Sequence, residues 1–245
     1  MTDLTETFWL AHTGLPREAP GSAETTRLLL RLAGDLPERP RILDVGCGTG
    51  PASVLLAQLT GGHVTAVDRH EPFLEALRDR ARAAGVDERI ETVAAPMDDL
   101  PVAAGSVDLL WAEGSAYLMG FDNALAAWRP LLAPGGTLVL TEAEWLTADP
   151  APAARAFWDA DYPAMRTTAG NVEAIQRAGW TVRAAYLLPD EDWDAYYGPL
   201  GDRIEQLRAD GVPAGLLDRV GEEIEIRRAH GGDYSYMGYV VRAQR

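Results

Sequence analysis

The residues best suited to chemistry are glycines and an acidic residue at the end of one apolar run. Asp44-Val45-Gly46-Cys47-Gly48-Thr49-Gly50 joins this run, residues 41–45, to a helical pattern. Glycine allows left-handed backbone angles and lets a ligand approach the chain closely. In an open α/β sheet, ligands bind at the carboxyl ends of the strands. The segment therefore predicts a ligand site where the first strand passes into a helix.

The spacing of these glycines indicates what kind of ligand binds. A dinucleotide fingerprint reads G-x-G-x-x-G and presents a helix N-terminus to a pyrophosphate, whereas Gly46, Gly48 and Gly50 read G-x-G-x-G. Asp44 precedes them, and a carboxylate there suits a cation or an amine better than a pyrophosphate. Asp68 ends the next predicted strand, where an acidic residue can accept hydrogen bonds from a ribose diol. We expect a nucleoside with a cationic tail, and S-adenosylmethionine meets both demands.

The elements that must position these residues alternate along the chain. Strands are predicted at residues 41–45, 63–68, 90–94, 107–111, 137–142, 180–187 and 234–242. Helices are predicted at 23–33, 52–59, 72–84, 124–132, 171–178, 202–209 and 214–228, with Ser22 and Asn171 as N-caps and Gly85 as a stop. Strands separated by helices of about 10–15 residues indicate right-handed crossovers and a mostly parallel sheet.

Two late segments, residues 143–170 and 189–231, depart from this alternation and are rich in aromatic residues. They carry Trp145, Phe157, Trp158, Tyr162, Trp193, Tyr196 and Tyr197. Both fall between late strands, where an insertion can cover a ligand site. As a group these aromatic residues predict a lid, and extra packing helices are the alternative.

Three segments of the chain resemble motifs of a known family. Asp44 to Gly50 resembles the glycine loop of class I S-adenosylmethionine-dependent methyltransferases. Pro134-Gly135-Gly136-Thr137-Leu138 resembles the turn before a strand in the same family, and Asp99-Leu100-Pro101 resembles its third-strand loop. The resemblance spans about residues 40–145. Outside it, residues 15–22 and 111–117 are similar to a bacterial small-molecule branch whose members mostly lack an assigned substrate.

The resemblance implies the architecture. It predicts an α/β fold with a doubly wound, mostly parallel, seven-stranded sheet of the Rossmann-like class I methyltransferase type. The last strand is expected to enter antiparallel beside the sixth. We expect a single methyltransferase domain over residues 1–245, with an N-terminal helical cap at 1–36 and lid or substrate-binding insertions at 143–170 and 189–231.

The resemblance also implies which residues bind S-adenosylmethionine and its product S-adenosylhomocysteine. The glycine loop would hold the methionine portion, Asp44 would support the loop or meet the amino group, and Asp68 would take the ribose hydroxyls. Many relatives place an acidic residue at the adenine edge, but that position here is Pro96, so Asp98 is assigned to it. The full predicted set is Asp44, Gly46, Cys47, Gly48, Gly50, Asp68, Arg69, Met97 and Asp98. Cys47 is expected to fill a tight turn rather than act as a nucleophile.

Three residues are candidates for binding or deprotonating the methyl acceptor. Glu113 follows the fourth strand on the ligand-binding edge, Tyr117 comes shortly after it, and His12 lies in a segment that relatives fold over the active site. Methyl transfer is an in-line displacement that depends mainly on orientation. A base is needed only if the acceptor must lose a proton. For Glu113 the alternative is a solvated loop carboxylate.

Other carboxylates of the chain are harder to assign to the site. Glu142 and Glu144 end the fifth strand, where each faces either the ligand edge or solvent, and residues 222–225 are expected to form a solvated helix face. Carboxylates and aromatic rings around a pocket suit a cationic amine. This favours N-methylation, with O-methylation as the alternative.

Composition limits the partners. A formal charge of −15 and a pI near 4.6 argue against nucleic acid and anionic membrane surfaces. The single cysteine and the spacing of the four histidines predict no disulfide and no metal site. No signal peptide or membrane-spanning run is recognised, so a cytoplasmic protein acting on a small molecule, monomeric or homodimeric, is predicted. A nicotinamide-dependent oxidoreductase and a non-catalytic S-adenosylmethionine-binding regulatory module are the alternatives from other classes.

Overall fold

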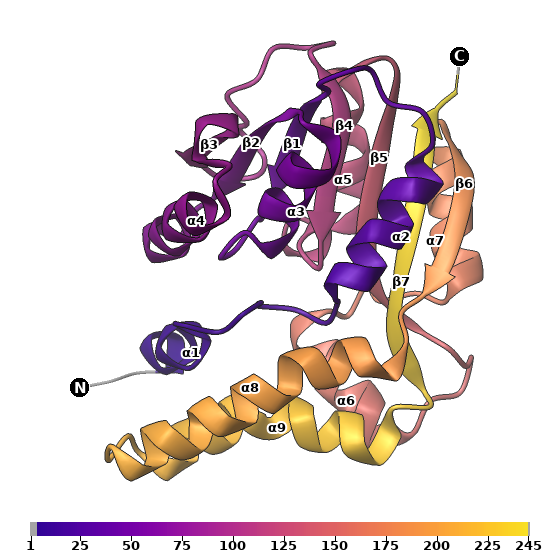
Figure 1. The fold of residues 1–245 in the computed structure, drawn as a ribbon. Coiled ribbons are helices and arrows are strands. Elements are labelled where there is room, and N and C mark those ends of the chain that lie inside the picture. Colours follow the sequence, from indigo (N-terminus) through magenta and orange to yellow (C-terminus); the bar gives the residue numbers. More distant parts are fainter. Residues whose placement is uncertain (1–3, 245) are drawn as a thin grey trace.

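The sheet is the feature that places the predicted site. The computed structural model describes residues 4–244. Seven strands form one sheet in the order β3-β2-β1-β4-β5-β7-β6 (Figure 1). Neighbours among β1 to β5 pair in parallel, and β7 is antiparallel to both β5 and β6. The predicted fold class, including the antiparallel last strand beside the sixth, is confirmed. The strands are β1 (Arg41–Val45), β2 (His63–Asp68), β3 (Ile90–Ala94), β4 (Val107–Glu113), β5 (Leu132–Trp145), β6 (Trp180–Leu187) and β7 (Tyr234–Ala243).

Helices cover both faces of the sheet. The α-helices are α1 (Leu4–His12), α2 (Ala23–Ala33), α3 (Pro51–Thr60), α4 (Glu71–Ala84), α5 (Phe121–Trp128), α6 (Pro152–Asp161), α7 (Thr168–Arg177), α8 (Asp190–Ala209) and α9 (Ala214–His230). Three short 3-10 helices are η1 (Asp87–Arg89), η2 (Ala116–Leu118) and η3 (Arg129–Leu131). Side chains alternate along a strand, so Ile42 packs in a core with α2, α3 and α4, and Leu43 packs in a core with α5 and α7.

A third buried cluster lies beyond the carboxyl edge of the sheet. It joins the ends of β5 and β7, at Trp145 and Tyr234, to residues of α1, α6, α8 and α9, among them Trp193 and Leu217. Figure 1 shows α1, α6, α8 and α9 gathered on this side of the sheet. The inserted segments therefore lie beyond the carboxyl ends of the parallel strands, and their role as a lid stays a prediction. Among residues 4–244, no helix is both long enough and apolar enough to cross a membrane.

The cap signals seen in the sequence are mostly confirmed. Ser22 caps α2, because its hydroxyl accepts the N–H of Thr25 at 3.1 Å. Gly85 ends α4 with a left-handed φ of 66°. Asn171 is not an N-cap as predicted: Thr167 caps α7, and Asn171 lies inside the helix with its side chain amide donating to Glu144 at 2.9 Å.

The predicted helix at 124–132 was wrong at both ends. The α-helix covers Phe121–Trp128, and a 3-10 turn follows it. Leu132 already pairs with Val107 of β4, so β5 begins before the Pro134-Gly135-Gly136 turn, and a register irregularity between Val107 and Leu109 absorbs that turn. The helix predicted at 202–209 is also longer, because α8 begins at Asp190 and includes Trp193 and Tyr196.

Candidate active site

The glycine loop turns sharply at the end of β1. The N–H groups of Gly46 and Cys47 both donate to the carbonyl of Val67, at 2.8 and 3.0 Å. Gly46, Gly48 and Gly50 have φ values of 72°, 54° and 75°, which only glycine adopts without strain. A Cβ on Gly46 would lie 2.5 Å from Cβ of Ser115. The loop is therefore fixed to the end of β2 and packed closely against the chain that follows β4.

The two predicted aspartates hold the loop from opposite sides. Asp44 is buried, and its Oδ2 accepts the hydroxyl of Ser53 in the first turn of α3 at 2.5 Å. Burial, together with the charges of Glu113 and Asp68, raises the pKa of Asp44 to about 7. Asp68 accepts the N–H of Gly48 at 3.0 Å and that of His70 at 2.8 Å. Asp44 thus ties the end of β1 to α3, and Asp68 lies beside Gly48; the predicted ribose contact of Asp68 stays a prediction.

Of the remaining predicted cofactor residues, Cys47 lies in this loop and Met97 lies close to it. The Cys47 thiol is buried, and burial raises its pKa well above the usual range, which fits the predicted filling role. The methyl carbon of Met97 lies 3.9 Å from the position of a Cβ on Gly46, and the carbonyl of Met97 accepts the indole N–H of Trp128 at 3.1 Å. Arg69 and Asp98 are exposed. Ser115, which was not predicted, donates its hydroxyl to the carbonyl of Val45 at 2.7 Å.

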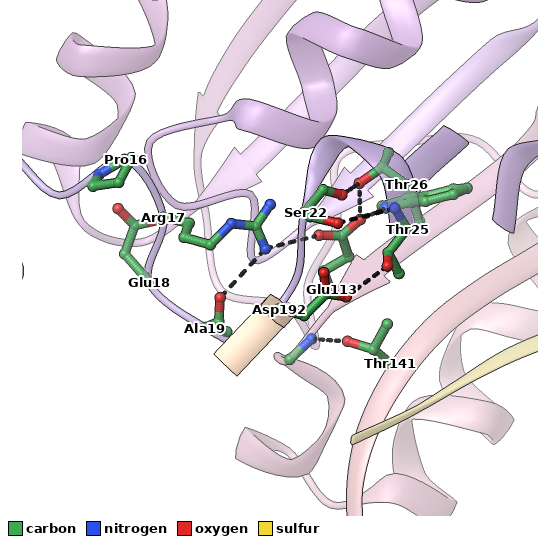
Figure 2. Close-up of polar contacts among 12 residues, drawn as sticks. Pro16, Arg17, Glu18, Ala19, Ser22, Thr25, Thr26, Glu113, Thr141 and Asp192 are labelled. Atoms are coloured by element: carbon green, nitrogen blue, oxygen red, sulfur yellow. Dashed lines mark hydrogen bonds and ion pairs between the residues drawn. The ribbon is translucent and has the colours of Figure 1, made fainter. Parts of the chain in front are cut away.

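Glu113 binds the N-terminal segment rather than facing solvent. Its Oε1 accepts the hydroxyl of Thr26 at 2.8 Å and the indole N–H of Trp111 at 3.0 Å. Arg17 pairs with its Oε2 at 3.9 Å. Figure 2 shows Arg17 and Thr26 converging on this carboxylate. These contacts fasten residues 15–22, here called the strap, to the end of β4. The catalytic role of Glu113 stays a prediction.

His12 is the first member of a hydrogen-bonded chain that crosses three helices. Its Nδ1 lies 2.7 Å from the carbonyl of Phe8, and its Nε2 lies 2.9 Å from the hydroxyl of Tyr196. That hydroxyl lies 3.0 Å from Oε1 of Glu223. Because a backbone carbonyl only accepts, Nδ1 carries a proton. The two hydrogen bonds of Tyr196 then need the hydroxyl proton of Tyr196 and one shared proton, which lies either on Nε2 of His12 or on Glu223.

The position of that shared proton follows from burial. Burial lowers the pKa of His12 and raises the pKa of Glu223 to about 7. Both shifts favour a neutral imidazole and a protonated carboxyl group. The prediction that residues 222–225 form a solvated face is therefore wrong for Glu223. Its neighbours on the run, Glu222 and Glu225, pair with Arg219 and Arg228 on the outside of α9.

Two carboxylates at the end of β5 differ sharply in their surroundings. Glu144 accepts hydrogen bonds from Asn171, from Tyr239 at 2.6 Å and from Thr168. Glu142 lies on the same face of the strand, is 1% exposed, and has no hydrogen-bond partner for either oxygen among the described residues. The prediction left both carboxylates open between the ligand edge and solvent, and both are buried.

Tyrosines surround the unpartnered carboxylate. Tyr162 lies near enough to lower the pKa of Glu142, yet its hydroxyl also has no partner of normal hydrogen-bond geometry among residues 4–244. The rings of Tyr162 and Tyr117 lie 5.5 Å apart. Burial outweighs these neighbours and raises the pKa of Glu142 to about 8. It also raises the pKa of Tyr117 to about 12. Tyr117 is therefore an uncharged phenol at neutral pH.

The predicted residues thus fall into two groups. The glycine loop, Asp44, Asp68 and Met97 come together at the ends of β1 and β2, whereas Tyr117 lies beside Tyr162, and His12 lies beside Phe8 and Tyr196. Sequence reasoning left Glu142 open and missed Glu18 and Glu223. The alternation of Leu138, Leu140 and Glu142 on one face of a buried strand is the signal that could have placed Glu142 inside. Within residues 4–244, no three His, Cys, Asp or Glu side chains lie together as a metal site.

This combination defines a class: a doubly wound nucleotide-binding fold with a glycine loop and an acidic residue at the end of the second strand. Residues 42–136 match the family model described as a methyltransferase domain. A solved S-adenosylmethionine-dependent methyltransferase from Geobacter sulfurreducens, in complex with S-adenosylhomocysteine, has the same fold, with a TM-score of 0.87 at 18% identity over 100% of both chains. Residues 42–136 are thus similar in sequence to a methyltransferase domain, and the chain shares the fold of the Geobacter enzyme.

Curated relatives match about half of this chain. The 27-O-demethylrifamycin SV methyltransferase of Amycolatopsis mediterranei is 38% identical over 119 residues, which are 47% of this chain and 44% of that protein. The glycine/sarcosine/dimethylglycine N-methyltransferase of Actinopolyspora halophila is 32% identical over 138 residues, 54% of this chain and 24% of that protein. The chain thus spans less than half of the length of these relatives.

The glycine loop yields a stability prediction. A Cβ on Gly50 would lie 2.1 Å from Cδ1 of Leu77, whereas Gly61, with a similar φ of 65°, has open space around it. Gly61→Ala should cost about 1–2 kcal/mol, because only the left-handed backbone is strained. Gly50→Ala should cost about 1–3 kcal/mol more, because it also overpacks the core. Urea unfolding of both variants measures the difference, and equal losses would contradict the close contact at Gly50.

The buried carboxyl group of Glu142 yields a pH prediction. Its pKa rises from 4.5 to about 8 on folding, so between these values the unfolded chain binds fewer protons than the folded chain. Stability then falls as the pH rises through this window. Replacing Glu142 by Gln should flatten the fall by up to roughly 1.4 kcal/mol per pH unit.

The measurement is the free energy of unfolding in urea at pH values from about 5 to 8. The matched control is Glu173→Gln, because Glu173 is a surface carboxylate of α7 paired with Arg177. Its curve should run parallel to that of the wild type. A Glu142→Gln curve that is also parallel to the wild type would show that Glu142 titrates like an exposed glutamate.

Proposed function

We propose that this protein is an S-adenosylmethionine-dependent methyltransferase that transfers a methyl group to an amine nitrogen of a small molecule. The observation that carries the choice of acceptor is Glu142, a buried carboxyl group without a hydrogen-bond partner among the described residues, beside Tyr162 and close to Tyr117 and Tyr236. Leaving such a group unpaired costs about 1–3 kcal/mol or more. An ammonium group of a substrate would satisfy it.

The residues at the glycine loop fit the cofactor. The side chains of Asp44, Asp68 and Glu18 give this place a negative character, which suits the positive sulfonium and ammonium groups of S-adenosylmethionine. The absence of a Cβ at Gly46 and Gly48 lets Ser115 and Glu18 pack directly on the loop. The loop would hold the methionine portion and Asp68 the ribose, while Met97, Asp98 and Arg69 would lie toward the adenine. When bound, the cofactor supplies a methyl group on a positively charged sulfur.

The acceptor would lie among the tyrosines under the lid helices. Aromatic ring faces attract cations, with about 0.5–2 kcal/mol at each favourable contact. Tyr117 and Tyr162 present neighbouring rings beside Glu142. Arg166 is the cation that acts on this carboxylate, but it is paired with Asp122 at 2.5 Å. The site therefore keeps an uncompensated carboxyl group for a positively charged acceptor.

Proton transfer follows from the same group. An amine attacks only through its free lone pair, so an ammonium acceptor first gives a proton to a base; the nitrogen then forms its bond to the methyl carbon as the carbon–sulfur bond breaks. Above its pKa of about 8, Glu142 is a carboxylate and can take up that proton. His12 and Tyr117 remain candidates for acceptor binding, and Glu113 positions the strap over the site.

A hydroxyl acceptor is the second candidate. The Amycolatopsis relative is named for an O-demethylated substrate, and the Actinopolyspora relative for N-methylation. A protonated Glu142 and the Tyr117 phenol could donate hydrogen bonds to an alcohol or phenol. We favour the amine, because a neutral hydroxyl does not compensate a buried carboxylate at the pH where Glu142 loses its proton.

The test is turnover with a panel of acceptors. Purified protein is incubated with S-adenosylmethionine and matched primary amines, secondary amines, alcohols and phenols at pH 8.5, and S-adenosylhomocysteine is measured by mass spectrometry. Amines should be methylated and their hydroxyl analogues should not. Glu142→Gln should lower kcat/KM for the amine by about 30-fold or more, since a buried charge partner is worth about 2–5 kcal/mol.

The control is Glu173→Gln on the surface of α7, which should leave turnover within twofold of the wild type. Turnover of hydroxyl compounds alone would replace the amine by the second candidate. Binding of S-adenosylmethionine without turnover of any acceptor would favour a non-catalytic regulatory module instead.

A further inference from the structure

The strap sends neighbouring side chains in opposite directions. Arg17 points toward Glu113 at the end of β4, while Glu18 points away from it (Figure 2). The strap is held at several places: Arg80 of α4 donates to the carbonyl of Pro16 at 3.2 Å, and Gly21 donates to the carbonyl of Asp192 at 3.1 Å. Glu18 is therefore brought to the glycine loop by a backbone that is tied on both sides.

The Glu18 carboxylate lies directly on the glycine loop. Its Oε2 accepts the N–H of Thr49 at 3.1 Å, and a Cβ on Gly48 would lie 2.2 Å from the same oxygen. The other oxygen, Oε1, is buried and has no hydrogen-bond partner among the described residues. One oxygen thus fixes the side chain, and the other remains available to a ligand at the loop.

A second carboxylate lies on the other side of the same glycine. Asp68 accepts the N–H of Gly48, while Glu18 accepts the N–H of the next residue, Thr49. The charge of Asp68 adds to burial in raising the pKa of Glu18 to about 7, and Arg80 only partly offsets it. Two carboxylates held this close favour a cation between or beside them.

We propose that Glu18 belongs to the cofactor site and that its carboxylate makes the site prefer S-adenosylmethionine over S-adenosylhomocysteine. The two molecules differ by the methyl group that turns a neutral thioether into a positive sulfonium. A carboxylate at the loop attracts the extra charge of the first and gains nothing from it in the second. Glu18 then favours binding of the substrate and release of the product. The inference rests on the cofactor assignment and is independent of the proposed amine acceptor.

The test is calorimetric titration of the full chain with S-adenosylmethionine and with S-adenosylhomocysteine. Glu18→Gln keeps the shape and removes the charge. It should weaken binding of S-adenosylmethionine about tenfold, the effect of about 1.4 kcal/mol, and change binding of S-adenosylhomocysteine less than about twofold. The matched control is Glu24→Gln, because Glu24 follows the strap but pairs with Arg27 on the surface of α2. It should alter neither constant.

Other outcomes overturn the inference. Equal weakening of both ligands, or no change, would restrict Glu18 to holding the strap, and tighter binding of both would mean that Glu18 competes with the cofactor for the loop. If circular dichroism shows that Glu18→Gln is unfolded, the two constants are measured on Glu18→Ala with the same expected ratio. A wild-type chain that binds neither ligand would instead refute the cofactor assignment itself.

Discussion

The carbonyl of Val67 is the anchor on which the site depends. By accepting the N–H groups of both Gly46 and Cys47, it folds the end of β1 back against the end of β2. That turn brings the N–H of Gly48 to Asp68 and presents the N–H of Thr49 to Glu18. Left-handed glycines make the turn possible, and parallel strand pairing between β1 and β2 holds Val67 in place. The contacts proposed for the cofactor would thus follow from backbone geometry at one edge of the sheet.

Several buried carboxyl groups lie around this edge. Their burial lowers the stability of the fold but suits them to function. Burial raises the pKa values of Asp44, Glu18 and Glu223 to about 7 and that of Glu142 to about 8. Their hydrogen-bond partners differ. Asp44 accepts from Ser53, Glu18 accepts from the N–H of Thr49, and Glu223 lies beside the Tyr196 hydroxyl, which also contacts His12. Carboxyl groups that are shielded from water and titrate near neutral pH are suited to binding cations and transferring protons.

The sequence predicted the sheet well, but it predicted poorly which residues the N-terminal and inserted segments bring together. Continuous apolar runs such as residues 41–45 and 63–68 predict their strands because a strand buried on both faces has few alternatives. Glycine spacing and Asp68 predict the loop because both act through the local backbone. The roles of Glu18, Glu113 and Glu223 depend on contacts with distant segments, namely Thr49, Arg17 and Tyr196. No local pattern carries that information, so Glu223 looked like any solvated helix residue.

The central claim is that a nucleoside sulfonium binds across the glycine loop with its ribose on Asp68. The most direct measurement is titration of S-adenosylmethionine into the wild type and Asp68→Ala, with Glu173→Ala on the surface of α7 as the control. The account predicts measurable binding by the wild type and a loss of about tenfold or more for Asp68→Ala, since a buried hydrogen bond to a charged group is worth about 1.5–3 kcal/mol. Absence of binding to the wild type, together with no effect of Asp68→Ala on any ligand, would contradict it.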